Sequence, residues 1–242
     1  MNAHGYVSLA AKGRFQEALE VILDVLPMAG SLGRVCAHPC ETECRRKQME
    51  APMSIRDIKR LVSDNAARKT AGGTFGTAEA REEKGAIIEA GPGGVTAAWH
   101  LGRNGIKSTI FEKTQVSGGA LRTGIPDYRL PVNIIQEEVD FILDHSGSEI
   151  KYGQALGVDF SIDDLFKQGF KAVFIATGAG RDFSLGLPGE ESDKIIPCGK
   201  FLIDVNVGTK PDLTGNRVLV RGGGNVATDV ARPAVRLGAK TV

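Results

Sequence analysis

The sequence predicts an α/β protein in which a small all-α region precedes a doubly wound parallel sheet and the start of a second unit of the same kind. Two observations carry this prediction. Residues 85–113, GAIIEAGPGGVTAAWHLGRNGIKSTIFEK, show an apolar run, a glycine-rich turn, a helical pattern and a second apolar run. Residues 217–242, RVLVRGGGNVATDVARPAVRLGAKTV, restate that pattern 133 residues later. Alternating strand and helix signals of this kind favour parallel strands joined by crossover helices.

The first unit has the layout of a dinucleotide-binding strand, turn, helix and strand. Its glycine-rich turn spans 91–94, and its second strand, 108–111, ends on Glu112, 21 residues after Gly91. In such units the turn lets the backbone approach a pyrophosphate, the helix N-terminus donates amides, and the acid accepts from ribose hydroxyls. A full motif would have glycine where this chain has Glu89. Taken alone, the turn is equally compatible with an ordinary strand–turn–helix of an α/β core.

The second unit keeps the glycine motif intact. Gly222, Gly224 and Ala227 stand at the positions that correspond to the first turn, and alanine is an accepted third member. Two dinucleotide units in one chain predict two nucleotide cofactors, and hence a flavin reduced by a nicotinamide. Two residues oppose the pattern: Arg221 puts a charge in an expected buried strand, and Pro233 falls inside the expected helix, at a cost of ~3 kcal/mol if that helix stays straight.

Composition excludes several classes of protein. The 242 residues are 42% apolar and 24% charged, with a net charge of +1 and no basic stripe that would indicate nucleic-acid binding. No apolar run reaches the length of a membrane span, and the N-terminus lacks a signal-peptide layout. The sequence therefore predicts a cytoplasmic protein that binds neither nucleic acid nor membrane.

Three of the four cysteines lie close together. Cys36, Cys40 and Cys44 are spaced C-x3-C-x3-C, which supplies soft thiolate ligands suited to zinc or iron–sulfur. The spacing matches neither paired zinc motifs nor the common bacterial ferredoxin run, so reduced structural cysteines remain an alternative. His38 could complete a zinc site, and a helix from Cys40 would place Cys44 on the same face. Cys198 is expected to be a small core residue.

The remaining elements are predicted from periodicity and capping signals. Polar, glycine-containing residues 63–83 indicate a linker and a domain boundary. We expect helices at 15–26, at 55–62 after Ser54, at 132–145 before Gly147, and at 201–205. A capping box of Ser161 and Asp164 predicts a further helix that ends at Gln168. A loop is expected at 28–33, a short strand near Ile150 and a buried strand in KAVFIATGAG.

Several motifs together carry a family resemblance. GRVCAHPCETECRR, AGPGG with IFEK, GGALRTGIPDYRLP, AVFIATGAG and GGGNVATDVARPAVRLGA occur in that order. The chain resembles the small subunit of NADPH-dependent glutamate synthase and its relatives, among them the N-terminal half of dihydropyrimidine dehydrogenase. The resemblance implies an oxidoreductase in which hydride passes from NADP(H) to FAD and electrons leave through [4Fe–4S] clusters to a larger catalytic subunit or another acceptor protein. No catalytic side chain is then needed, because the cofactors carry the chemistry.

The resemblance also implies domains and site residues. The domains would be 1–70, helical and iron–sulfur; 82–212, a Rossmann-like FAD-binding domain that is incomplete; and 213–242, the truncated start of an NAD(P)H-binding unit. Metal ligands would be Cys36, Cys40 and Cys44. Cofactor contacts would be Ala90, Gly91, Pro92, Gly93, Gly94, Glu112, Gly119, Ala120, Arg129, Ala176, Thr177, Gly178, Gly223, Gly224, Asn225 and Val226.

Departures from the family pattern leave alternatives. Relatives place further cluster cysteines upstream, and the acid that would choose NADP over NAD falls beyond Val242, so the sequence reads as a fragment. A non-catalytic adaptor that keeps the fold is one alternative, and a zinc module fused to a single-nucleotide enzyme is another. A third is the flavin subunit of another complex, of the ferredoxin:NADP oxidoreductase or dihydropyrimidine dehydrogenase type.

Overall fold

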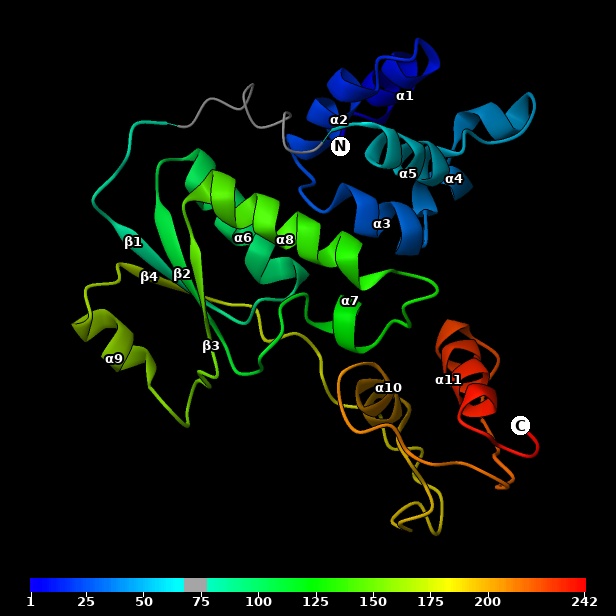
Figure 1. Ribbon diagram of the computed structural model, residues 1–242. Coiled ribbons are helices and arrows are strands. Elements are labelled where there is room, and N and C mark those ends of the chain that lie inside the picture. Colours follow the sequence, from blue (N-terminus) through cyan, green and yellow to red (C-terminus); the bar gives the residue numbers. More distant parts are fainter. Residues whose placement is uncertain (68–77) are drawn as a thin grey trace.

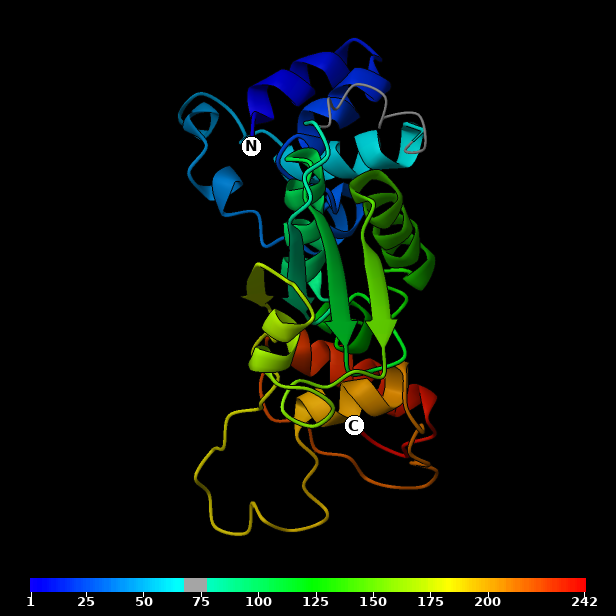
Figure 2. The ribbon, with the colours of Figure 1, turned by 90° about the vertical axis from the view of Figure 1, so that its left-hand side faces the viewer.

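The computed structural model describes residues 1–67 and 78–242. Its centre is a four-stranded sheet in the order β3-β2-β1-β4, with every pair parallel (Figure 1). All strands point toward the helices α10 and α11 (Figure 2). The predicted α/β class with a parallel sheet is therefore confirmed. The strands are β1 (Lys84–Ile88), β2 (Lys107–Glu112), β3 (Glu149–Tyr152) and β4 (Ala172–Ile175).

Helices lie on both faces of the sheet. Successive strand residues point to opposite faces, so Ile87 and Ile110 join the large core under α6 and α8, whereas Ile88 and Phe111 pack with Leu165 of α9. The predicted helix at 132–145 is α8, and Gly147 ends it in the left-handed conformation that favours glycine. The three helices are α6 (Pro92–Arg103), α8 (Val132–Ser146) and α9 (Ile162–Lys167).

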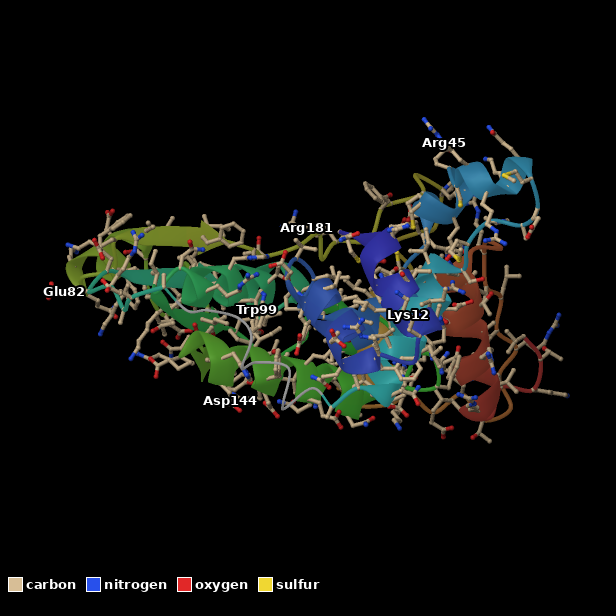
Figure 3. The ribbon with its side chains drawn as sticks, turned by 90° about the horizontal axis from the view of Figure 1, so that it is seen from above. Lys12, Arg45, Glu82, Trp99, Asp144 and Arg181 are labelled. Atoms are coloured by element: carbon tan, nitrogen blue, oxygen red, sulfur yellow. The ribbon has the colours of Figure 1, made fainter. Side chains whose placement is uncertain are left out.

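The N-terminal helices pack on the same core. Buried residues of α2 and α5 join the cluster that contains α6 and α8. Trp99 lies at this junction (Figure 3), and its indole N–H donates to the carbonyl oxygen of Leu23 at 3.1 Å. The elements are α1 (Ala3–Ala11), α2 (Phe15–Leu23), α3 (Ala29–Val35), α4 (Pro39–Thr42), the 3₁₀ helix η1 (Arg45–Gln48) and α5 (Ile55–Asn65).

The predicted loop at 28–33 is wrong, because this segment is helix α3. Glu138, buried on α8, accepts hydrogen bonds from the backbone N–H groups of Gly30 (2.6 Å) and Ser31 (3.0 Å). A carboxylate at a helix N-terminus satisfies orphan donors and favours the helix dipole. Gly33 lies so close to Arg60 of α5 that a Cβ there would overlap its backbone. Tertiary contacts thus override two glycines with low helix propensity.

Other local predictions have mixed outcomes. The helices predicted at 15–26 and 55–62 are α2 and α5, although Ser54 makes no side-chain capping bond. The capping box of Ser161 and Asp164 is present at α9. The predicted linker begins too early, since 63–65 are helical, and its residues 68–77 lie outside the described part of the chain.

Strand β4 differs from the prediction of a buried strand. It pairs only with β1, and its Phe174 and Ile175 are 50% and 53% exposed. A continuous apolar run predicts burial on both faces, but none of the described residues forms a strand beyond β4. An apolar pocket of about 470 Å³ lies beside it, at the end of β1 away from the glycine turn, bordered by Ala97 and Leu101 of α6.

The C-terminal residues form a small separate core below the strand ends (Figure 2). The predicted helix at 201–205 is α10, and Cys198 packs at its start as a half-buried residue. The expected strand at 217–221 is absent from the described residues: one parallel bridge joins Arg217 to Thr241, and Arg221 is exposed. Helix α11 runs through Pro233. The elements here are α7 (Ala120–Thr123), α10 (Cys198–Asn206) and α11 (Asn225–Arg236).

None of the helices in the described ranges, 1–67 and 78–242, is both long and apolar enough to cross a bilayer.

Candidate functional site

Three segments that are far apart in the sequence meet at the carboxyl ends of β1, β2 and β4. The glycine turn at 90–94 follows β1, and the Gly118 N–H donates to the Ala90 carbonyl at 2.9 Å. Gly119 lies so near Gly91 that an added Cβ would be 2.7 Å from the Gly91 Cα. Ala176, directly after β4, faces Gly93. Parallel sheets bind ligands at this edge.

The close approach of these segments depends on glycine. Gly118 and Gly119 have φ of 103° and 50°, values that L side chains rarely adopt. A Cβ on Gly94 would overlap the carbonyl oxygen of Glu89, so the first turn of α6 could not pack on β1. The turn therefore presents backbone, with the N-terminus of α6 directly behind it and Gly91 as its N-cap.

Glu112 holds the turn from the end of β2. Its buried carboxylate accepts from the Ala90 N–H at 2.8 Å, and from the backbone N–H and hydroxyl of Thr114 at 2.9 and 2.7 Å. A carboxylate has about four acceptor positions, so three of them are used within the protein. The Glu89 side chain also interacts with this carboxylate, so the predicted ribose contact would compete with it for the remaining position.

Glu89 occupies the turn position that the motif assigns to glycine. Its φ is 77°, in the left-handed region, which explains why the motif calls for glycine there. Its carboxylate is 16% exposed and lies 3.5 Å from the Lys113 ammonium. Burial, and then the negative Glu112 beside it, raise the pKa of Glu89. The turn thus carries an acid whose charge is only partly neutralised.

Arg129, a predicted flavin contact, is engaged elsewhere in this structure. Its guanidinium forms a short ion pair with Asp229, a buried residue of α11. The loop that carries Arg129 is ordered by backbone bonds to Pro126 and by Asp127, which accepts from the Val132 N–H at 3.0 Å. A guanidinium has five donors, so this pairing leaves some of them for a second anion.

The second glycine turn is open to solvent. Gly224 is the N-cap of α11, and Gly223, Asn225 and Val226 are exposed beside it. A shallow pocket of about 340 Å³ lies against this turn, lined by Leu219, Val220, Gly222, Gly223, Ala227, Thr228, Ala231 and Val242. The predicted nicotinamide turn is therefore exposed at a helix N-terminus.

The cysteine segment projects from the body of the protein, with Arg45 at its outer side (Figure 3). The prediction that a helix from Cys40 aligns Cys44 is wrong: α4 ends at Thr42, and Cys44 is extended. Among the described residues, no three His, Cys, Asp or Glu side chains gather closely enough to hold a metal ion. His38 instead places its ring Nδ1 3.1 Å from the Cys36 carbonyl oxygen.

The donor chemistry of the segment nevertheless fits thiolate ligands. The His38 N–H lies 3.3 Å from the Cys36 sulfur. Backbone N–H groups of Met53, Arg46 and Lys47 lower the pKa of Cys44, which favours its thiolate. The segment thus supplies ligand types suited to an iron–sulfur cluster, whereas a four-thiolate set would need one more ligand.

Three functional candidates could not be found from the sequence. Lys59 is buried on α5, and burial lowers its pKa while the charges of Cys36 and Cys40 oppose that shift. Glu138 and Asp229 are buried carboxylates whose partners lie about 100 residues away. A single Glu or Asp in a helical sequence pattern is normally expected to be exposed to solvent. Only the tertiary structure shows that Glu138 and Asp229 are buried.

Two protein families match the chain. Residues 84–242, more than half of it, match the pyridine nucleotide-disulphide oxidoreductase family. Residues 1–71 match dihydropyrimidine dehydrogenase domain II, described as a 4Fe-4S cluster family. The cofactors predicted from the sequence, FAD, NADP(H) and [4Fe–4S], are those of these two families.

Relatives and a solved structure agree with these matches. The chain is 41% identical to the NADP(+)-dependent formate dehydrogenase subunit beta of Moorella thermoacetica, over 98% of the chain and 36% of the relative. It is 32% identical to the glutamate synthase [NADPH] small chain of Escherichia coli, over 99% of the chain and 54% of the relative. The chain thus spans about a third to a half of these relatives, which are both named as subunits.

FprA of Mycobacterium tuberculosis in complex with NADPH superposes with a TM-score of 0.56 at 26% identity, over 63% of the chain and 36% of FprA. The family matches, the relatives and the fold therefore all indicate a pyridine nucleotide-dependent oxidoreductase. This chain belongs to the pyridine nucleotide-disulphide oxidoreductase family and carries at its N-terminus a region of the dihydropyrimidine dehydrogenase domain II family.

Proposed function

We propose that this chain passes electrons from NAD(P)H through FAD to iron–sulfur clusters and a partner subunit, as part of a flavoprotein of the glutamate synthase small-subunit type. The observation that carries this proposal is the meeting of the 90–94 turn with Gly118, Gly119 and Ala176 at one edge of the sheet. Bound FAD would supply the step from hydride to single-electron chemistry. The name of one relative, the glutamate synthase [NADPH] small chain, includes NADPH, which supports NAD(P)H as the electron donor.

The residues of this chain would bind and orient the cofactors. Amides at the N-terminus of α6 would donate to the flavin pyrophosphate, and Glu112 would accept from the ribose. Gly119, Ala120, Arg129, Thr177 and Gly178 would line the flavin, and Gly223, Gly224, Asn225 and Val226 the nicotinamide nucleotide. The proposed division of the chain is 1–70 for the cluster, 82–212 for FAD and 213–242 for NAD(P)H.

Flavin titration tests this function. Saturable quenching of FAD fluorescence by the Glu89→Gly variant, with a protein-bound flavin absorbance spectrum, would support it. Absence of binding by both this variant and the wild type would favour a non-catalytic adaptor. Stoichiometric zinc in the purified chain would favour a zinc module. Which acceptor protein oxidises the reduced flavin would then distinguish glutamate synthase from related complexes.

The cysteine segment should hold iron only weakly by itself. Cys36, Cys40 and Cys44 are three thiolate ligands, and a [4Fe–4S] cluster usually takes four. Anaerobic reconstitution of the chain should therefore give substoichiometric, oxygen-labile iron, which Cys44→Ala should reduce further. The control is Cys198→Ala, at the distant α10, which should change nothing. A stable cluster with four irons per chain would contradict this expectation.

The nicotinamide turn should bind its nucleotide poorly. The second glycine turn is exposed, and the segment before it forms one bridge instead of a strand. The backbone N–H groups of this turn are therefore not fixed by a sheet in the orientation that binding of a phosphate requires. Calorimetric titration with NADPH should show no saturable binding at micromolar concentrations. A micromolar dissociation constant that is lost in Gly224→Val would show that the turn is already preorganised.

A further inference from the structure

Asp229 is a buried carboxylate in a helix whose other polar residues face solvent. Only 5% of its side chain is exposed. One oxygen pairs with the Arg129 guanidinium, and the Tyr128 hydroxyl donates to the other at 3.3 Å. A buried carboxylate is costly unless it is paired and hydrogen-bonded. Both partners come from the loop 126–130, about 100 residues earlier in the sequence, so the pairing of this carboxylate depends on a distant segment.

The same face of α11 makes a second contact with Tyr128. The guanidinium carbons of Arg232 and Arg236 lie 4.2 and 4.6 Å from the centre of its ring. Residues 229, 232 and 236 are spaced i, i+3 and i+7, so they share one helix face. Two arginines at i and i+4 repel each other on an isolated helix. The ring and the Asp229 carboxylate offset that repulsion, and the face is therefore complementary to two consecutive loop residues.

One side of this contact leads into α8, and the other side begins at a predicted nucleotide turn. The loop 126–130 opens α8, and its Leu130 is fully buried in the main core. On the other side, α11 begins at the second glycine turn with Gly224 as its N-cap. Between them, Asn206 of α10 donates to the carbonyl oxygen of Thr123 at 3.0 Å. Polar contacts thus join the two proposed nucleotide units in the described part of the chain, and the Asp229 pair includes a buried carboxylate.

We propose that Asp229 is a positioning residue that latches α11 to the loop 126–130 and fixes the direction of the Arg129 guanidinium. The pair uses some of the five guanidinium donors, and the rest stay available to an anion at the first unit. The second nucleotide unit therefore orients a flavin-side residue. Only this last consequence rests on the proposed function, because the latch itself needs no cofactor.

Hydrogen exchange of the full chain tests the latch without a ligand. Asp229→Asn and Arg129→Gln should each raise exchange at least tenfold in both segments, 126–130 and α11, and leave β1 and β2 unchanged. The double variant should exchange no faster than Asp229→Asn alone, because that substitution already removes the ion pair with Arg129. Asp229→Glu should restore part of the protection. The matched control is Asp204→Asn, which breaks an exposed pair with Lys200.

The latch is refuted if each variant loosens only its own segment, or if the two effects add. A separate titration with FAD addresses positioning: Asp229→Asn, placed in the Glu89→Gly background, should weaken FAD binding more than tenfold, and Asp204→Asn should not. Unchanged FAD affinity would contradict the proposal that Asp229 orients Arg129 for FAD binding. Absence of FAD binding in the Glu89→Gly parent itself would count against the proposed function, while the exchange data would still decide the latch.

Discussion

Glu89→Gly should raise the affinity for FAD about a hundredfold, and the wild-type chain should purify colourless. A carboxylate about 4 Å from a phosphate costs roughly 4 kcal/mol at an effective dielectric of 20. Lys113, 3.5 Å from this carboxylate, offsets part of that repulsion. Each factor of ten is about 1.4 kcal/mol, so a remainder near 3 kcal/mol gives the expected change. Fluorescence titration of the two proteins with FAD measures it.

Backbone strain at the same position adds a second effect. Glu89 adopts a φ of 77°, which costs an L residue about 1–2 kcal/mol and glycine almost nothing. Glu89→Gly should therefore also raise the melting temperature of the protein without cofactor. Glu89→Gln separates the two causes, because it removes the charge and keeps the strained side chain. It should recover most of the affinity but not the part of the stability that the strained backbone costs.

The wild-type affinity should depend on pH in a defined direction. Burial, and then Glu112, raise the pKa of Glu89, and Lys113 opposes this. As pH falls through that raised pKa, the side chain gains a proton and its repulsion of a phosphate disappears. FAD should then bind more tightly at low pH, with no such slope in Glu89→Gln. By linkage, an acid with a raised folded-state pKa also makes the folded protein less stable as pH rises through this window.

A yellow wild-type protein with stoichiometric FAD, unchanged by Glu89→Gly, would contradict the repulsion argument. It would mean that the Lys113 pair neutralises Glu89 completely or that the bound phosphates lie farther from it. Gly93→Val is the matched control for the site, because Gly93 lies against Ala176 where the glycine turn meets the end of β4. It should abolish the binding gained by Glu89→Gly.

The sequence predicts the sheet well because the relevant signals are local. The run at 84–88, the glycine turn and Glu112 specify a strand, a phosphate turn and a strand end within 30 residues. Their convergence with Gly119 and Ala176 follows from parallel topology, since carboxyl ends of parallel strands share one edge. The resemblance to a known family contributed the assignment of the outer segments.

The predictions that failed depend on contacts that periodicity cannot show. Helix α3 contains two glycines and no capping side chain of its own, so its sequence resembles a loop. Strand β4 has an apolar run but only one neighbouring strand among the described elements. The cysteine spacing fits a continuous helix, yet the backbone becomes extended at Cys44. In each case a tertiary contact, or its absence in the described residues, decides the structure.

Glu138 is the residue through which α8 supports the cysteine segment. Its two oxygens cap the N-terminus of α3 at Gly30 and Ser31, and α3 ends with Cys36 as its C-cap. Helix α8 itself begins after the loop that carries Arg129. The cap therefore connects the proposed flavin unit to the first cysteine, and its loss should destabilise the cysteine segment.

Glu138→Ala should lower the free energy of unfolding by about 3–5 kcal/mol. It leaves two buried N–H groups unpaired, at about 1–3 kcal/mol each, and removes a charge that favours the helix dipole. Urea denaturation measures the loss, and hydrogen exchange should show α3 opening first. Glu137→Ala, the exposed neighbour on the same helix, should change stability by less than about 0.5 kcal/mol. Equal effects of the two substitutions would mean that packing against α5, and not the Glu138 cap, stabilises α3.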